Sequence, residues 1–317
     1  MSSSDPVRAS ATSPAFERRI IAFVNPFSPR GAEARAALVQ AGVFEVVDLA
    51  PRTLRPQIES ALATGAGRVL VAGGDGTLGT AAAALLGTDT ELAVLPAGTL
   101  NHFAKDHAIP EDTSEAIGTA LRDDSTPVDI GVVSRHAFLN TASVGMYVRY
   151  VRTRERLEKY VGYRMASAAA LVATFLRPRQ ISVELQVEGA TRHYRTPLLF
   201  VGVGERELKA PEFGGRIQGG RRGLHVMILR GRRPARLLTT ALAAAARGVA
   251  HASASPDLDT FIVDSCTVGV WGRRSLTIGL DGELIRVAAP LEFRIARDAL
   301  RVVGARPPAE AIDGSPP

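Results

Sequence analysis

Cysteine is almost absent from the sequence, since Cys266 is the only one among 317 residues. A lone thiol cannot form an internal disulfide or a cysteine-rich metal cluster, so both kinds of framework are excluded. Aromatic residues are also scarce, at 5% of the chain, which argues against the stacking platforms that bind single-stranded nucleic acid. We therefore expect a reducing, cytoplasmic environment and no nucleic-acid partner.

Long hydrophobic runs are missing as well. The longest apolar stretches, Met165 to Leu176 and Leu237 to Ala246, are shorter than the roughly 20 residues of a membrane-spanning helix. The segment from Met1 to Pro14 is rich in Ser, Ala and Pro and lacks the apolar core of a signal peptide. The sequence thus predicts a chain that at most associates peripherally with a membrane.

Lysine is rare, and arginine supplies nearly all of the 38 basic residues in a chain of net charge +6. A basic surface of this kind can attract anionic lipid headgroups or nucleotide phosphates, but it does not distinguish between them. The candidates for a membrane-facing surface are Arg221, Arg222, Arg232, Arg233 and Arg236.

Short β-branched segments alternate with helical patterns over residues 19–135. This alternation predicts βαβ units and therefore an N-terminal α/β domain with a mostly parallel sheet. Ligands bind beyond the carboxyl ends of such strands, where this sequence carries polar or turn residues, so we expect one shared crevice. The predicted strands are Arg19 to Val24, Phe44 to Asp48, Arg68 to Ala72 and Leu92 to Leu95, and the predicted helices are Ala32 to Ala41, Thr53 to Ala63 and Thr77 to Leu86.

Residues 136–303 follow a different pattern. Tyr147 to Lys159 and Tyr163 to Leu176 are predicted helices, and short strands separated by turn signals follow them. Such a series is typical of an antiparallel sandwich, so we expect a β-rich second domain whose last strand is free to return to the first. A further helix is expected at Arg232 to Val249, a disordered segment at residues 1–18 and a tail at residues 304–317.

The strongest local signal is the segment Gly73-Gly74-Asp75-Gly76-Thr77. It follows a hydrophobic strand and opens an Ala-rich helix, so backbone N–H groups and a helix N-terminus can both face a phosphate. A glycine-rich turn without a ligand would have the same sequence. The spacing Gly74-x-Gly76-x-x-Gly79 also matches the dinucleotide fingerprint. That alternative is disfavoured, because the segment follows the third strand and the next strand end has no carboxylate.

A second turn, Pro96-Ala97-Gly98-Thr99-Leu100-Asn101, follows the fourth predicted strand. It delivers a hydroxyl and then an amide at the start of a short helix. Thr99 and Asn101 could therefore donate hydrogen bonds to phosphate oxygens. Capping of the short helix is the simpler role for either side chain.

These two segments together resemble the catalytic domain of diacylglycerol kinases and their bacterial lipid-kinase relatives. The resemblance covers about Arg19 to Val303, nearly the whole chain. It implies a two-domain lipid kinase, with ATP held by the α/β domain and the lipid by the β-rich domain. The other motifs that carry it are Val24-Asn25-Pro26, Val128-Asp129-Ile130-Gly131, Phe138 to Gly145 and Leu280-Asp281-Gly282-Glu283.

The resemblance also implies roles for individual residues. Gly73 to Thr77 would hold the ATP phosphates, Gly98 and Thr99 would help to bind ATP, and Glu283 would accept the proton of the lipid hydroxyl. Asp75 would hold Mg²⁺ directly or through water, because this hard cation prefers oxygen ligands. Without the family, Asp281-Gly282 would be interpreted as an ordinary hairpin turn.

Weaker candidates complete the expected site. Asn25 and Arg30 follow the first strand, and Arg30 could contact phosphates or simply be solvated. Asp48 ends the second strand and could reach the ribose or adenine, or cap a helix. Asp129 is a candidate for the metal-water network. Relatives often hold a second, structural Mg²⁺ at an Asp-Gly turn, but the corresponding segment Gln218 to Leu224 has no aspartate.

The resulting hypothesis is an ATP- and Mg²⁺-dependent kinase that phosphorylates diacylglycerol or a similar lipid alcohol at the membrane surface. A sphingosine-type alcohol is an alternative substrate. NAD kinases share a Gly-Gly-Asp-Gly loop on a related fold, but they leave the Pro96 to Asn101 pattern unexplained. A catalytically inactive nucleotide- or lipid-binding regulator is disfavoured by the presence of Asp75 and Glu283. The sequence leaves a homodimer open.

Overall fold

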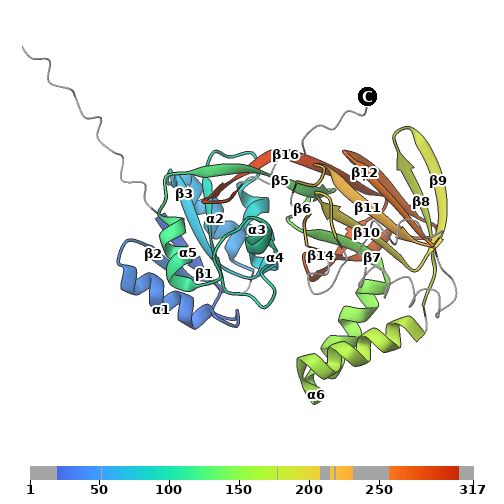
Figure 1. Cartoon of the computed structure of the whole chain (residues 1–317), viewed down its shortest axis with the longest axis horizontal. Coiled ribbons are helices and arrows are strands. Elements are labelled where there is room, and N and C mark those ends of the chain that lie inside the picture. Colours follow the sequence, from blue (N-terminus) through green and yellow to red (C-terminus); the bar gives the residue numbers. More distant parts are fainter. Residues whose placement is uncertain are drawn as a thin grey trace, which may run out of the picture.

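The computed structural model describes residues 20–50, 52–176, 178–207, 215–217, 219–230 and 257–306. The segment predicted over residues 1–18 and the helix predicted over 232–249 lie outside the described residues, together with Gln218 and most of the expected tail. The described chain forms an α/β half and a β-rich half that lie side by side (Figure 1). No described helix is long and apolar enough to cross a membrane.

The α/β half alternates strands and helices as the sequence predicts. Its sheet has the strand order β2-β1-β3-β4, and every neighbouring pair is parallel. The elements are β1 (Ile20–Val24), α1 (Gly31–Ala41), β2 (Glu45–Asp48), α2 (Leu54–Ala63), β3 (Arg68–Gly73), α3 (Asp75–Leu85), β4 (Glu91–Pro96), α4 (His102–Asp106) and α5 (Thr113–Ala120).

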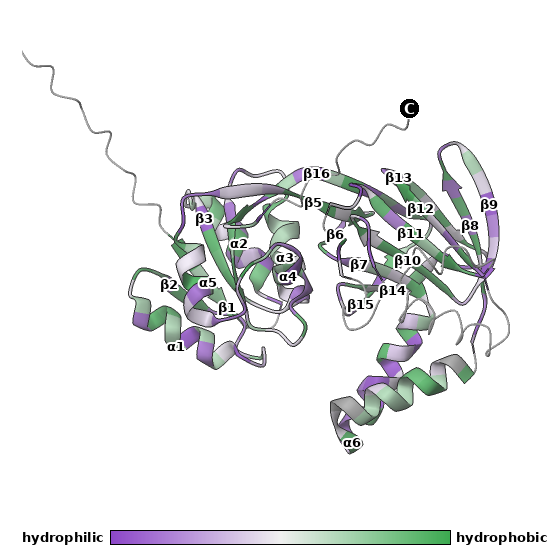
Figure 2. Ribbon diagram, in the orientation of Figure 1, coloured by the Kyte–Doolittle hydropathy of each residue, from purple (hydrophilic) through white to green (hydrophobic). Residues whose placement is uncertain are grey.

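Helices cover both faces of this sheet, which explains why its central strands are continuous apolar runs (Figure 2). Successive side chains of β3 point to opposite faces. Val69 and Val71 pack in the core beneath α2 and α3, whereas Leu70 and Ala72 pack in the core beneath α1 and α5. All residues of β3 and β4 are therefore buried, and their carboxyl ends meet at one edge of the sheet.

The β-rich half is a sandwich of two sheets. One has the order β12-β11-β10-β7-β14-β15, and β8, β9 and β13 lie in the other. The elements are β5 (Ser125–Val133), β6 (His136–Phe138), β7 (Thr141–Gly145), α6 (Met146–Leu176), β8 (Ile181–Val187), β9 (Ala190–Thr196), β10 (Leu198–Val203), β11 (Leu224–Leu229), β12 (Leu258–Val263), β13 (Ser265–Val270), β14 (Ser275–Leu280), β15 (Glu283–Ala288) and β16 (Leu291–Val303).

The last strand, β16, runs through both halves. It pairs with β13 of the sandwich, and Val302 lies in parallel register with Leu92 of β4. Strand β5 follows β16 on its other side, with a register irregularity between Ala296 and Leu300. The α/β sheet thus continues into the sandwich without a break (Figure 1). The predicted fold class is confirmed, and α6 has the predicted interruption, at Gly162.

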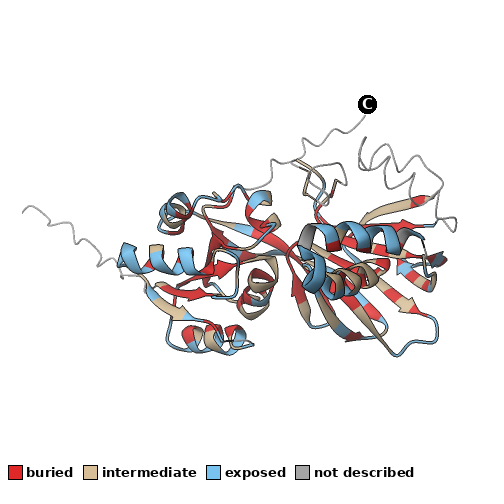
Figure 3. Ribbon diagram, turned by 90° about the horizontal axis from the view of Figure 1, so that it is seen from below, coloured by how far each residue is buried: buried red, intermediate tan, exposed pale blue. Residues whose placement is uncertain are grey.

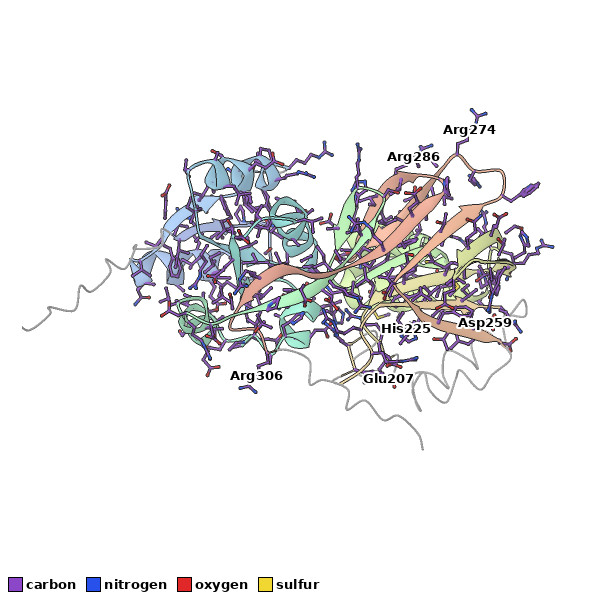
Figure 4. All side chains as sticks on the ribbon, turned by 90° about the horizontal axis from the view of Figure 1, so that it is seen from above. Glu207, His225, Asp259, Arg274, Arg286 and Arg306 are labelled. Atoms are coloured by element: carbon purple, nitrogen blue, oxygen red, sulfur yellow. The ribbon has the colours of Figure 1, made fainter. Side chains whose placement is uncertain are left out.

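A buried polar network joins the two halves. The carboxylate of Asp106, at the end of α4, accepts a hydrogen bond of 2.6 Å from Arg206 and another from the backbone of Arg216. Arg206 is completely buried, and its backbone N–H donates to Nδ1 of His225. Nε2 of His225, which Figure 4 labels, lies 2.6 Å from the Thr260 hydroxyl. Burial lowers the pKa of His225 to about 4.

This network predicts a loss of stability in mild acid. The neutral imidazole is favoured by the fold, so its contribution is complete above about pH 6.5 and is lost as the pH falls towards 4. His225→Asn keeps an acceptor for the Arg206 N–H but does not titrate. We expect its free energy of unfolding to fall less than that of the parent between pH 7 and 4, by about 2–3 kcal/mol. Urea unfolding at several pH values measures this difference, and parallel curves would contradict it.

Candidate active site

Two glycine loops touch at the carboxyl edge of the parallel sheet. They follow β3 and β4, which are neighbours in the sheet. A Cβ atom on Gly98 would lie 2.5 Å from the Cα of Gly74, so the loops can approach this closely only without side chains there. Asn101 holds the second loop, since its amide accepts from the Gly98 N–H at 2.9 Å and donates to the Gly98 carbonyl. Thr99 is exposed beside them.

Asp75 connects the first glycine loop to two other segments. Its Oδ2 accepts a hydrogen bond from the backbone of His102, and its Oδ1 accepts one from the backbone of Phe103 and one from the Asn140 amide. Asp75 therefore caps α4 and also reaches the loop before β7. The expected phosphate loop is anchored to both halves of the molecule by this one carboxylate.

Asp281 is a second anchor, which sequence reasoning treated only as part of a turn. Its carboxylate accepts hydrogen bonds from three successive backbone N–H groups, those of Leu139, Asn140 and Thr141, at 2.7–2.9 Å. Burial raises the pKa of Asp281 to about 6, against these hydrogen bonds, and the nearby charge of Asp75 raises it further. Asn140 therefore lies between two carboxylates.

The sequence places Asp281 and Asn140 in motifs of the family resemblance, but it does not indicate a structural role for either residue. Neither motif alone indicates that the two segments meet. Asp281 and Gly282 have φ angles of 45° and 91°, so the predicted hairpin turn does join β14 to β15. The turn and the buried anchor coexist, because the Asp281 side chain points into the molecule.

Glu283 begins β15 and lies against the first glycine loop. A Cβ atom on Gly76 would be 2.3 Å from Oε1 of Glu283, so the two residues are in direct contact. The fold thus brings together two residues that are far apart in sequence. The predicted proton acceptor and the predicted phosphate loop form one site.

Two clefts meet at Glu283 and Gly76. One has a volume of about 320 Å³ and lies towards the α/β half, where Asn25, Phe27 and Thr77 line it. The other, of about 150 Å³, lies towards the β-rich half and is lined by residues such as Arg135 and Ile285. The Glu283 carboxylate therefore stands between a space beside the glycine loop and a space beside the sandwich.

Asn25 and Arg30 also support the loops. The Asn25 amide donates to the Thr77 hydroxyl at 3.1 Å, which ties the end of β1 to the first glycine loop. Arg30 donates to the carbonyls of Pro96 and Glu111 at 2.8 and 2.6 Å. The guanidinium of Arg30 therefore holds the second loop in place and is not a solvated surface group.

Asp48 and Asp129 have ion-pair partners outside this cluster. Asp48 pairs with Arg35 at 2.8 Å, and both side chains are about half exposed. Asp129 binds the guanidinium of Arg222 and accepts the backbone N–H of Asp298 at 3.0 Å. Burial opposes ionisation of Asp129, but the Arg222 hydrogen bonds keep its pKa below the usual value. Arg222 is thus engaged in an ion pair with Asp129 although its side chain is 44% exposed, and its expected place on a membrane-facing surface stays a prediction.

The donor set around Asp75 fits a magnesium ion that arrives with phosphates. Among the described residues, no three His, Cys, Asp or Glu side chains are grouped to hold a metal by themselves. Asn140 Oδ1 is buried and accepts no hydrogen bond within the described chain, which leaves an amide oxygen beside the Asp75 carboxylate. Mg²⁺ commonly uses one or two such oxygens and completes its shell with water and substrate phosphates.

Comparison with known proteins agrees with the fold and with the resemblance seen in the sequence. Residues 19–133 match the family described as the diacylglycerol kinase catalytic domain. A protein of Pseudomonas putida named probable lipid kinase YegS-like is 37% identical over 154 residues, which are 46% of this chain and 50% of that protein. Residues 19–133 therefore belong to the diacylglycerol kinase catalytic-domain family.

Other matches extend the likeness. The diacylglycerol kinase of Mycobacterium tuberculosis H37Rv is 28% identical over 184 residues, covering 54% of this chain and 60% of that protein. The alignments thus span about half the length of the curated relatives. A crystal structure of a diacylglycerol kinase from Bacillus anthracis str. Sterne has a TM-score of 0.65 at 16% identity and covers 92% of this chain and 97% of that one. At that identity, the likeness shows the fold.

The Asp75 anchor of this catalytic domain can be tested by removing one acceptor oxygen. Asp75→Asn keeps the shape, but its amide group would face a backbone N–H of α4. We expect a loss of about 1–3 kcal/mol in the free energy of unfolding, measured by urea titration. Asp112→Asn is a matched control, because Asp112 caps α5 through Oδ1 alone and asparagine can replace it there. Equal losses in the two variants would contradict the role of both Asp75 oxygens.

Proposed function

We propose that the protein is an ATP-dependent lipid kinase that transfers the γ-phosphoryl group to the hydroxyl of diacylglycerol or a similar lipid alcohol. The observation that carries this proposal is the contact of Glu283 with Gly76. A carboxylate that can accept a proton lies at the first glycine loop, which the family resemblance implies as the phosphate-binding loop. Names of the relatives support a lipid as the acceptor, in agreement with the resemblance seen in the sequence.

The nucleotide would occupy the cleft beside Asn25 and Thr77, with its phosphates towards Gly76. The start of α3 lies at this loop, so its unpaired N–H groups and partial positive charge favour the phosphates. The second loop, with Gly98 and Thr99, touches the first at Gly74 and would complete the phosphate side. Mg²⁺, held by Asp75 and Asn140, would neutralise phosphate charge when bound.

The lipid hydroxyl would approach from the cleft on the sandwich side of Glu283. Its oxygen forms a bond to the γ-phosphorus, while the bond from that phosphorus to the bridging oxygen of ADP breaks. The hydroxyl proton passes to the Glu283 carboxylate. Phosphoryl transfer depends mainly on positioning and charge neutralisation. The protein would therefore contribute mainly by holding the nucleotide cleft and the lipid cleft in a fixed relative position.

Labelled ATP, purified protein and a panel of diacylglycerol, sphingosine and NAD test the assignment. We expect label in a phosphatidic-acid-like product and little in the sphingosine or NAD product. Transfer to sphingosine alone would favour a long-chain alcohol kinase, and transfer to NAD alone would contradict a lipid kinase. No transfer to any acceptor would favour a nucleotide- or lipid-binding regulator.

Glu283→Gln should slow transfer strongly. Glutamine keeps the size and reach of the side chain but cannot take the hydroxyl proton, a step that is worth roughly 10²- to 10⁴-fold in rate. ATP binding should be nearly unchanged, as measured by calorimetry. Glu292→Gln, at an exposed position of β16, is the control. Equal turnover of the two variants would exclude Glu283 as the proton acceptor.

Gly76→Ala tests the contact itself. The new methyl group would collide with the flexible end of Glu283, to which the three nearest atoms all belong, and would displace its carboxylate. We expect turnover to fall by about tenfold or more, whereas the midpoint of thermal unfolding should change little. A variant with parental turnover would mean that Glu283 does not act from its position beside Gly76.

A further inference from the structure

The second part of α6, from Met165 to Leu176, has the reverse of the polarity expected for a surface helix. Its large apolar side chains Met165, Leu171, Val172 and Leu176 are 51–65% exposed. The side chains buried against the protein are small or polar, namely Ala166, Ala170 and Thr174. The same helix is largely exposed in Figure 3 and apolar along this part in Figure 2. A helix that packs on a protein in water normally buries its large apolar face.

Charge is excluded from this stretch and concentrated around it. No Asp, Glu, Lys or Arg occurs from Met165 to Leu176. The segment from Met146 to Arg179 as a whole contains eight Lys or Arg and two Glu, a net charge of +6 that equals the formal charge of the entire chain. An uncharged apolar face bordered by basic residues is complementary to the apolar interior and anionic headgroups of a lipid leaflet.

An exposed tryptophan lies at the same end of the sandwich. Trp271, the only tryptophan of the chain, is 87% exposed in the turn between β13 and β14. Its backbone N–H donates to the carbonyl of Ser182, near the start of β8, which follows α6. Arg273 and Arg274 come next in this turn, and Figure 4 shows Arg274 projecting from the molecule. Tryptophan with arginine is typical of membrane–water interfaces.

The body of α6 is attached firmly to the sandwich. Met146 donates its backbone N–H to the Pro197 carbonyl at 2.7 Å, and Arg152 donates to the Thr277 hydroxyl at 3.2 Å. Tyr147 packs against Gly279 of β14. The first part of the helix is therefore fixed to the strands that carry the active-site turn, and the apolar part extends beyond it.

We propose that the outer face of α6, from Met165 to Leu176, together with Trp271, docks on an anionic lipid bilayer and lies in its headgroup region. The exposure and charge of this surface carry the inference, and the proposed lipid-kinase function supplies only the reason why the protein would dock on a membrane. A second copy of the chain is a poorer occupant, because a two-fold interface would set this basic segment against itself.

The test compares the parent with Leu171→Glu/Leu176→Glu. Both positions are exposed, so the fold should persist, and circular dichroism checks this. Binding is measured by sedimentation with phosphatidylcholine vesicles that contain about 30 mol% phosphatidylglycerol. We expect the affinity of the variant for these vesicles to be at least about tenfold lower than that of the parent, because two charges would enter the apolar layer. Val39→Glu/Val43→Glu, at exposed apolar positions of α1 and its end, is the matched control and should bind as the parent does.

Two further readouts separate docking from catalysis. Brominated lipids should quench Trp271 in the vesicle-bound parent, and bound protein without quenching would contradict the location of this turn in the bilayer. Phosphorylation of dissolved dihexanoylglycerol should be the same in parent and variant, whereas phosphorylation of diacylglycerol in vesicles should fall with binding. If the double glutamate variant does not fold, Leu171→Gln/Leu176→Gln replaces it. We then expect smaller decreases in vesicle binding and in phosphorylation of vesicle diacylglycerol.

The outcomes are distinct for the surface and for the proposed function. Equal vesicle binding by parent and variant, or no binding by the parent, would overturn the docking surface. A parent dimer that becomes monomeric in the variant, with vesicle binding unchanged, would assign the face to a second copy and overturn the proposal. A parent that binds vesicles through α6 but phosphorylates neither lipid would leave the surface intact and contradict the kinase.

Discussion

The geometry of the candidate site depends on the hydrogen bonds that the carboxylate of Asp281 accepts. This carboxylate binds the N–H groups of three successive residues, Leu139 to Thr141, and so fixes the β14–β15 turn against the loop before β7. Removing a carboxylate from water is costly unless hydrogen bonds replace its hydration. Because Glu283 follows only two residues later, the same contact determines where its side chain meets Gly76.

Asn140 extends this arrangement to the nucleotide side. Its backbone N–H binds Asp281, and its amide binds Asp75, which in turn caps α4 and opens α3. The turn that carries the proposed proton acceptor and the loop proposed to face the phosphates are therefore linked through one residue. Such a chain of hydrogen bonds restricts the distance between the two clefts, and phosphoryl transfer requires that distance to be well defined.

Local sequence patterns predict most helices and strands, but they do not predict contacts between residues that are far apart in the sequence. The apolar runs of β3 and β4, the helices between them and the break of α6 near Gly162 follow from periodicity and turn residues. Strand β9, with the sequence ATRHYRT, has no apolar alternation that would predict it, because this polar edge strand buries only Tyr194 and Thr196. Nothing near Asp129 in the sequence indicates that Arg222 will bind it, nor does anything near Gly76 indicate Glu283. These pairings arise only when β5 and β16 join the two halves.

Strand β7 and the first part of α6 connect the candidate site to the proposed membrane surface. Thr141, beside the Asp281 anchor, begins β7, and α6 begins directly after the last residue of that strand. A strand of this length spans about 16 Å, and β7 is paired with β10 on one side and β14 on the other. Pairing on both sides holds β7 in place, and the bond from Arg152 to Thr277 fixes the first part of α6 to β14. A bilayer that holds α6 would therefore also set the height and orientation of the clefts at Glu283, so that docking and presentation of the lipid hydroxyl depend on the same strands.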